Sequence, residues 1–240
     1  MTAPPPDGNL DARAGRWAAL CEPFLREHVA GDAAHDLAHV RRVVAWAGRI
    51  GRDEGADLDV VLPAAWLHDC VVLPKDHPAR AQASRRAAER AAAWLREHGE
   101  PEARVAAVAH AIEAHSFSAG VEPRTLEARV VQDADRLDAL GAIGVARCYA
   151  TAGALGAALT HPTDPVPTWA DPDAAPPDAA PPEPPRPLDD RRYATDHVYA
   201  KLLRLPSTMR TRAGRAEAER RAAFLRAFLA QLASEAGGAS

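Results

Sequence analysis

The sequence predicts an all-α protein, and three observations indicate this fold class. From residue 14 onward, apolar residues recur at steps of three and four, the spacing of one face of an α-helix, and β-branched alternation is rare. The 240 residues are 47% apolar, enough for one moderately large domain to bury its core without disulfides. Pro78 and Pro101 suit the first turn of a helix. We therefore expect a helical bundle with a C-terminal helical extension.

The elements follow in order from this periodicity. Residues 1–13 are polar and rich in proline, and we expect them to form a disordered tail. Helices are expected at residues 14–30, 36–52, 57–72, 78–98, 102–115, 124–150, 190–204 and 213–235. Pro63 lies within the third helix, so that helix either starts there or is kinked. Gly141 and Gly144 each cost about 1 kcal/mol against alanine inside the long helix, which predicts close packing around a central element.

The dense prolines of residues 161–187 interrupt the pattern. Such a segment cannot continue a helix and is expected to be a loop of extended character. We favour a passive connection, and a lid over the site is the alternative, suggested by His161 and Trp169. The following residues, 188–240, are too few for a large core of their own, so their helices are expected to pack on the core of residues 14–160.

His68 and Asp69 stand together inside the apolar run of residues 60–73. Burying an imidazole and a carboxylate together costs several kcal/mol, roughly, unless a cation, a proton or hydrogen bonds compensate them. Two further groups lie on apolar helical faces, namely His39 and Asp135. Taken alone, each histidine is more often an ordinary core residue, but buried aspartates are rare without a partner. The four side chains together favour a metal site.

The segments around these residues resemble a known family, the HD-domain metal-dependent phosphohydrolases. The resemblance rests on HDLAHVRRV (35–43), AAWLHDC (64–70) and VVQDADRLDALGAIGVAR (130–147). Within that superfamily the chain looks most like the bacterial branch described as nucleotide pyrophosphohydrolase-like, through LPKDHPARAQAS (73–84), HSFS (115–118) and DHVYAKLLRL (196–205). It implies an all-α HD-domain helical bundle.

The resemblance implies metal ligands at His39, His68, Asp69 and Asp135, with Asp69 also acting in catalysis. Two imidazoles and two carboxylates without a thiolate suit a hard or borderline divalent cation, with Mn²⁺ expected first and Mg²⁺, Fe²⁺ or Co²⁺ as alternatives. His115 is expected to act as a general acid, a second-metal ligand or a core histidine, in that order. A two-metal site that includes His110 is a minority interpretation.

Substrate contacts are expected from side chains that could meet phosphate or base. Lys75 and Arg80 follow the His-Asp pair and could bind a polyphosphate. The resemblance supplies most of the weight here, since each would otherwise be an ordinary surface charge. The weaker candidates are His35, Arg136, Asp138, His197 and Lys201.

The activity implied is hydrolysis of a nucleoside triphosphate to monophosphate and pyrophosphate. A phosphodiesterase, a nucleotidase and a non-catalytic metal- or nucleotide-binding regulator remain alternatives. HD enzymes that hydrolyse the alarmone ppGpp carry acidic residues three and four positions after the metal-binding aspartate, where this chain has Val72 and Leu73. Alarmone hydrolysis is therefore disfavoured.

Composition excludes several other classes. The net charge of −4 with interspersed signs argues against a nucleic-acid-binding protein. No apolar stretch reaches the ~18–20 residues that cross a bilayer, so no membrane partner is expected. The three cysteines show no C-x-x-C spacing and no signal peptide precedes them, which predicts a reducing, cytoplasmic location. Formation of a homodimer is left open.

Overall fold

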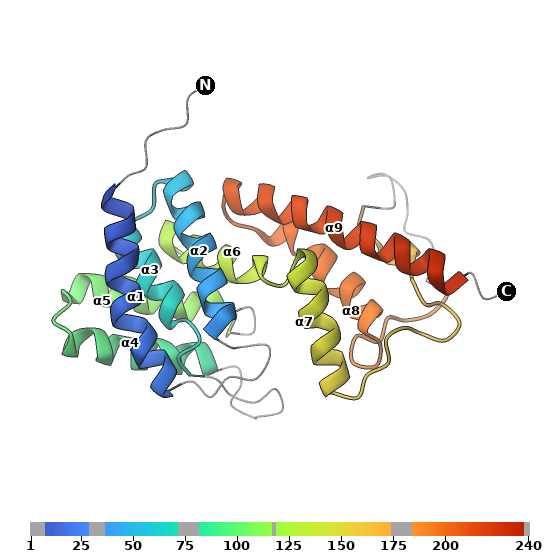
Figure 1. Ribbon diagram of the computed structural model, residues 1–240, viewed down its shortest axis with the longest axis horizontal. Helices are drawn as coiled ribbons and strands as arrows, with labels where there is room; N and C mark the ends of the chain where they lie inside the picture. Colours follow the sequence, from blue (N-terminus) through green and yellow to red (C-terminus); the bar gives the residue numbers. More distant parts are fainter. Residues whose placement is uncertain (1–7, 29–36, 72–81, 117–118, 174–183, 238–240) are drawn as a thin grey trace, which may run out of the picture. The chain divides into compact units, whose positions relative to one another are not determined.

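The computed structural model describes residues 8–28, 37–71, 82–116, 119–173 and 184–237 (Figure 1). Across these ranges the chain is helical and contains no strand, and one isolated bridge pairs Ala158 with Tyr193. The prediction of an all-α fold is confirmed.

The chain forms two compact units, residues 1–135 and 136–240. The first contains α1 (Gly8–His28), α2 (Leu37–Glu54), α3 (Leu58–Leu67), α4 (Ala83–Glu97), α5 (Glu102–His115) and most of α6 (Leu126–Leu137). The second contains α7 (Gly141–Ala154), η3 (Thr168–Ala170), α8 (Ala194–Ala200), η4 (Leu202–Arg204), η5 (Pro206–Thr208) and α9 (Arg212–Gly237). The boundary between the units lies inside α6, after Asp135, whereas the expected core extended to residue 160.

Helix α1 begins earlier than expected, at Gly8, so residues 8–13 belong to a helix and not to a disordered tail. Asp11 lies in its first turn, where a negative charge is favourable because the amino end of a helix carries partial positive charge. The residues before Gly8 lie outside the described part of the chain.

Helix α3 is the centre of the first unit and packs against α1, α2 and α5. Asp57 caps its amino end, where the Asp57 carboxylate accepts a hydrogen bond from the Asp59 N–H at 2.9 Å. Nine of its ten residues are buried. Because the helix begins at Leu58, Pro63 lies in its interior, and the idea that the helix starts at Pro63 is wrong.

The single helix expected at 124–150 is also wrong, since α6 ends at Leu137 and α7 begins at Gly141. Gly141 has a φ of 69°, which other residues rarely adopt, so it allows the chain to turn between the two helices. A Cβ atom on Gly144 would lie 2.2 Å from the Ala139 carbonyl oxygen. Gly144 is therefore required by a close contact within this turn, and not by the packing of a long central helix that the sequence predicted.

In the second unit, α7 packs against α9, and α8 packs against α7 and η4. The proline-rich segment contributes specific contacts here. Arg186 donates to both carboxylate oxygens of Asp196 at 2.6 and 2.7 Å and to Asp164 Oδ2 at 3.0 Å. Asp196 is fully buried. These ion pairs favour a structural role for the described ends of the segment over a purely passive connection, and proline content gave no sign of them.

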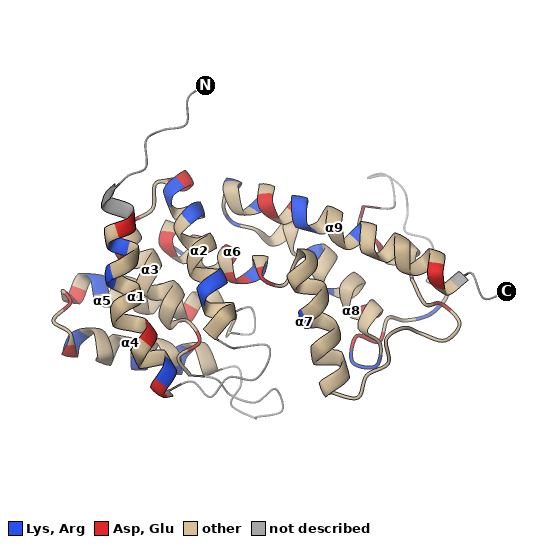
Figure 2. Ribbon diagram, in the orientation of Figure 1, with Lys and Arg blue, Asp and Glu red and all other residues tan. Residues whose placement is uncertain are grey.

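Charged residues of both signs occur along α9 and on the other helices of the first unit, whereas α3 carries only Asp59 (Figure 2). This distribution marks α3 as the buried helix of its unit. None of the described helices is long and apolar enough to cross a membrane.

Candidate metal centre

Four candidate ligands come together in the first unit from three helices. His39 lies in the first turn of α2, His68 caps the carboxyl end of α3 and is followed by Asp69, and Asp135 lies in the last turn of α6. The two histidines are 2% and 0% exposed. The ends of three helices therefore bring imidazoles and carboxylates from distant parts of the sequence to one place.

The distances between these side chains are short enough for one ion to be shared. His39 Nε2 lies 3.5 Å from Asp135 Oδ1 and 3.8 Å from Asp69 Oδ2. His68 Nε2 lies 3.4 Å from Asp69 Oδ2 and 3.8 Å from Asp135 Oδ1. In each of two triads, His39–His68–Asp135 and His68–Asp69–His115, all candidate ligand atoms lie within 4.8 Å of one another.

The His68 ring is oriented for metal binding. Its Nδ1 lies 2.8 Å from the Ala65 carbonyl oxygen, which can only accept, so Nδ1 carries the proton. In the neutral ring Nε2 then presents a lone pair, and this buried atom has no hydrogen-bond partner among the described residues. A buried nitrogen that faces two carboxylates is unfavourable unless a cation or proton joins them. The residues present therefore fit a divalent cation.

The electrostatics of the protein alone point the same way. Burial disfavours the charged form of His68, but the carboxylates of Asp69 and Asp135 outweigh burial and raise the pKa of His68 to about 9. Burial favours the neutral form of Asp69, but its neighbour His68 outweighs burial and holds the pKa of Asp69 well below its usual range. The cluster thus attracts positive charge.

His115, the last residue of α5, joins the same cluster. Its Nε2 lies 3.7 Å from Asp69 Oδ1, and its ring meets that of His68 edge-on at 4.9 Å between centroids. Its Nδ1 lies 2.6 Å from the Ile112 carbonyl oxygen, so the Nε2 of the neutral ring is an acceptor. Burial, and then the charge of His68, lower the pKa of His115, which favours that neutral form. His110 instead accepts from the Arg124 N–H at 3.1 Å and belongs to neither triad.

Of the other candidate substrate contacts, three lie outside the described part of the chain and four lie in the second unit. His35, Lys75 and Arg80 lie outside the described residues, as do Val72 and Leu73.

The rest belong to the second unit and have partners there. Arg136 Nη1 donates to the Thr208 carbonyl oxygen at 2.8 Å. Asp138 is 3% exposed and accepts from Arg147 at 2.7 Å, which suits a structural ion pair better than contact with a substrate. His197 and Lys201 both face Asp190, at 3.6 and 2.5 Å.

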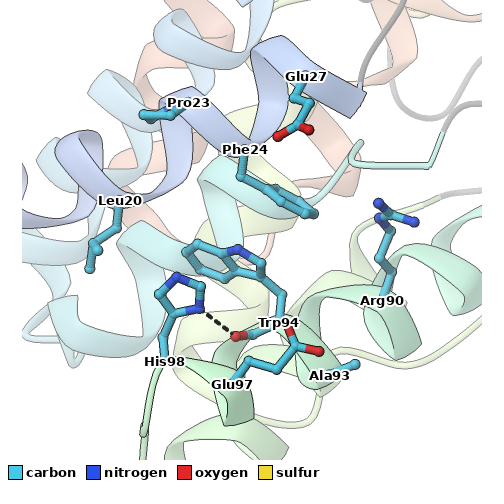
Figure 3. A pocket seen from close by; sticks show the side chains of 9 residues that line it. All are labelled: Leu20, Pro23, Phe24, Glu27, Arg90, Ala93, Trp94, Glu97 and His98. Atoms are coloured by element: carbon cyan, nitrogen blue, oxygen red, sulfur yellow. Dashed lines mark hydrogen bonds between the residues drawn. The ribbon is translucent and has the colours of Figure 1, made fainter.

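A groove of about 520 Å³ lies between α1 and α4 (Figure 3). Three rings lie in contact along it. The centroids of Phe24 and Trp94 are 5.1 Å apart, those of Trp94 and His98 are 4.1 Å apart, and both pairs of rings are tilted. Glu27 and Glu97 line it as well. It contains none of the candidate metal ligands, so the groove and the metal centre are separate features of the first unit.

Comparison with known proteins assigns the family. The HD domain model matches residues 36–140, which contain all four candidate ligands. YpgQ of Bacillus subtilis is 32% identical over 211 residues, covering 86% of this chain and 87% of YpgQ. The chain belongs to the HD-domain superfamily of metal-dependent phosphohydrolases. HD domains bind divalent metals, in agreement with the donor set described above.

Solved structures agree with this assignment. The structure of B. subtilis YpgQ in complex with ADP has a TM-score of 0.64 and 28% identity, covering 94% of this chain and 96% of YpgQ. An HD-superfamily hydrolase from Bacillus thuringiensis has a TM-score of 0.66 and 29% identity, covering 95% of this chain and 99% of its own. A protein from Lactobacillus plantarum has a TM-score of 0.66 and 31% identity, covering 92% and 96%.

Proposed function

We propose that this HD hydrolase is a nucleoside triphosphate pyrophosphohydrolase, acting on ribo- or deoxyribonucleotides and dependent on Mn²⁺. Water attacks the α-phosphorus, the bond from that phosphorus to the bridging α–β oxygen breaks, and the products are a nucleoside monophosphate and pyrophosphate. The observation that carries the proposal is the cluster itself: His68 Nε2 is buried, lacks a hydrogen-bond partner among the described residues and faces Asp69 and Asp135. His39 lies beside the same two carboxylates. The complex of YpgQ with ADP supports a nucleotide as the ligand.

The four residues would hold the ion, and His68 is common to both triads. When bound, a divalent cation polarises a phosphoryl oxygen and makes water more acidic. Mn²⁺ is proposed because mixed imidazole and carboxylate ligands suit a cation of intermediate hardness.

His115 is proposed to hold the proton that the attacking water loses. Its Nδ1–H is committed to the Ile112 carbonyl, so its Nε2 lone pair faces the cluster beside Asp69 Oδ1. This geometry favours a base or a second-ion ligand over the general acid that the sequence suggested first. Lys75 and Arg80 are proposed to offset the charge of the polyphosphate, and His35 is proposed as a further substrate contact.

A screen of ribo- and deoxyribonucleoside triphosphates with Mn²⁺, Mg²⁺, Fe²⁺ or Co²⁺ tests the proposal when the released product is resolved. Pyrophosphate is expected. Inorganic phosphate alone would indicate a nucleotidase, and turnover confined to diesters would indicate a phosphodiesterase. No turnover with any cation, despite tight nucleotide binding, would favour the regulator.

Matched variants then test the site. His68→Ala and Asp69→Ala are expected to lose bound metal and turnover together, because each removes a ligand. His98→Ala is the control, since His98 stacks on Trp94 outside the cluster. Full metal content and turnover in both ligand variants would refute the proposed site.

A further inference from the structure

We propose that Gln132 is a positioning residue of the metal centre, one that sets the distance between α5 and α6 and so holds His115 beside Asp69, and Asp135 beside His39 and His68. The inference rests on the proposed function, because it concerns how the same site is held in shape. Gln132 was not among the residues that the sequence singled out.

Gln132 of α6 makes a buried hydrogen bond to the backbone of α5. Gln132 is 3% exposed, and its Nε2 donates to the Ala114 carbonyl oxygen at 2.8 Å. A carbonyl oxygen can only accept, so this contact fixes the orientation of the amide and places its nitrogen toward α5. The Gln132 side chain is thus held in one orientation between the two helices.

This hydrogen bond lies at the carboxyl end of α5. Helix α5 ends at His115, and the next residue, Ser116, has an extended backbone. The last carbonyl groups of a helix have no partner within the helix. Gln132 satisfies the one at Ala114, the residue before His115, while the His115 ring satisfies the one at Ile112. The end of α5 that carries His115 is therefore held to α6 by the hydrogen bond from Gln132.

On α6, the hydrogen bond comes from a residue close to the candidate ligand Asp135. Gln132 precedes Asp135 by three residues, so the two side chains lie on neighbouring positions of one helix face. Asp135 faces His39 and His68, while His115 faces Asp69. A single buried hydrogen bond thus links the backbone next to His115 with the helix turn that carries Asp135.

The oxygen of the Gln132 amide supports the same role. Gln132 Oε1 is buried and has no hydrogen-bond partner among the described residues. Leaving a buried acceptor without a partner costs free energy, so a side chain chosen for stability alone would be apolar. The amide is better explained by the donor that it supplies to Ala114.

The test uses the full-length protein loaded with Co²⁺, whose visible spectrum reports ligand geometry without any substrate. Gln132→Met keeps the volume of the side chain and removes the donor. We expect it to weaken Co²⁺ affinity by roughly 10- to 100-fold, as loss of a partner that orients ligands typically does, and to alter the Co²⁺ spectrum. Turnover is expected to fall through kcat more than through KM. Gln132→Asn, which keeps the amide but cannot reach Ala114, is expected to behave alike.

Two controls separate positioning from general loosening. Arg129→Met removes a contact to the Pro123 carbonyl from the same helix, and Thr195→Val removes a hydrogen bond from a buried hydroxyl to the Leu159 carbonyl in the second unit. Both should leave the Co²⁺ spectrum unchanged. Wild-type Co²⁺ affinity and spectrum in the Gln132 variants, or equal changes in the controls, would overturn the inference. If the wild-type protein releases no pyrophosphate, the proposed function fails, yet the Co²⁺ measurements still decide the role of Gln132.

Discussion

The ion pair between Arg186 and Asp196 allows a sharp prediction about stability. Asp196 is fully buried and accepts three hydrogen bonds, two from Arg186 and one from the Asp189 N–H at 2.8 Å. Replacing Arg186 with methionine removes two of the three and leaves a buried carboxylate without its counter-charge. Breaking a buried ion pair in this way costs about 3–5 kcal/mol. For a chain of this size, that corresponds to a melting temperature lower by roughly 6–20 °C.

The assay is thermal and urea unfolding of Arg186→Met beside a matched control. Arg220→Met serves as the control, because Arg220 pairs with Glu217 at 2.6 Å but is 71% exposed. Exposed pairs contribute little, so the control should unfold with the wild-type protein. A double variant, Arg186→Met with Asp196→Asn, should recover much of the loss, since the asparagine amide can still accept from Asp189 and no charge remains buried. Equal unfolding midpoints for Arg186→Met and Arg220→Met would refute the reasoning.

Three further predictions follow from the fold and the site. Gly144→Ala should destabilise the protein by about 1–3 kcal/mol in urea unfolding, because its Cβ would collide with the Ala139 backbone; Gly153→Ala, in open space on the same helix, should be neutral or stabilising, and equal effects would contradict the clash. Replacing residues 161–187 with a Gly/Ser linker, which the sequence alone predicts to be harmless, should now lower the melting temperature as Arg186→Met does; an unchanged melting temperature would restore the passive connection. Lys75→Ala should keep its bound metal, measured by elemental analysis, but raise KM for triphosphates, and unchanged kinetics would make Lys75 an ordinary surface charge.

The cluster could be predicted from the sequence because its residues violate a general rule. Aspartate and histidine seldom stand inside apolar runs, so His68 and Asp69 attract attention without any structure. The turn between α6 and α7 could not be predicted, since apolar spacing continues through it and a glycine such as Gly141 is compatible with either a helix or a turn. The partners of Arg186 and Gln132 were missed for a related reason: each makes a contact between segments, and neither composition nor periodicity records which segments meet.

The positions of the ligands within their helices have an electrostatic consequence. His68, His115 and Asp135 all lie at the carboxyl ends of α3, α5 and α6, where aligned peptide dipoles leave partial negative charge, roughly half an elementary charge per helix. Only His39 comes from an amino end. The backbone therefore adds its own field to that of the two carboxylates, and without a cation the cluster should repel phosphate. A nucleotide should bind well only after the cation, which predicts ordered binding with the metal first.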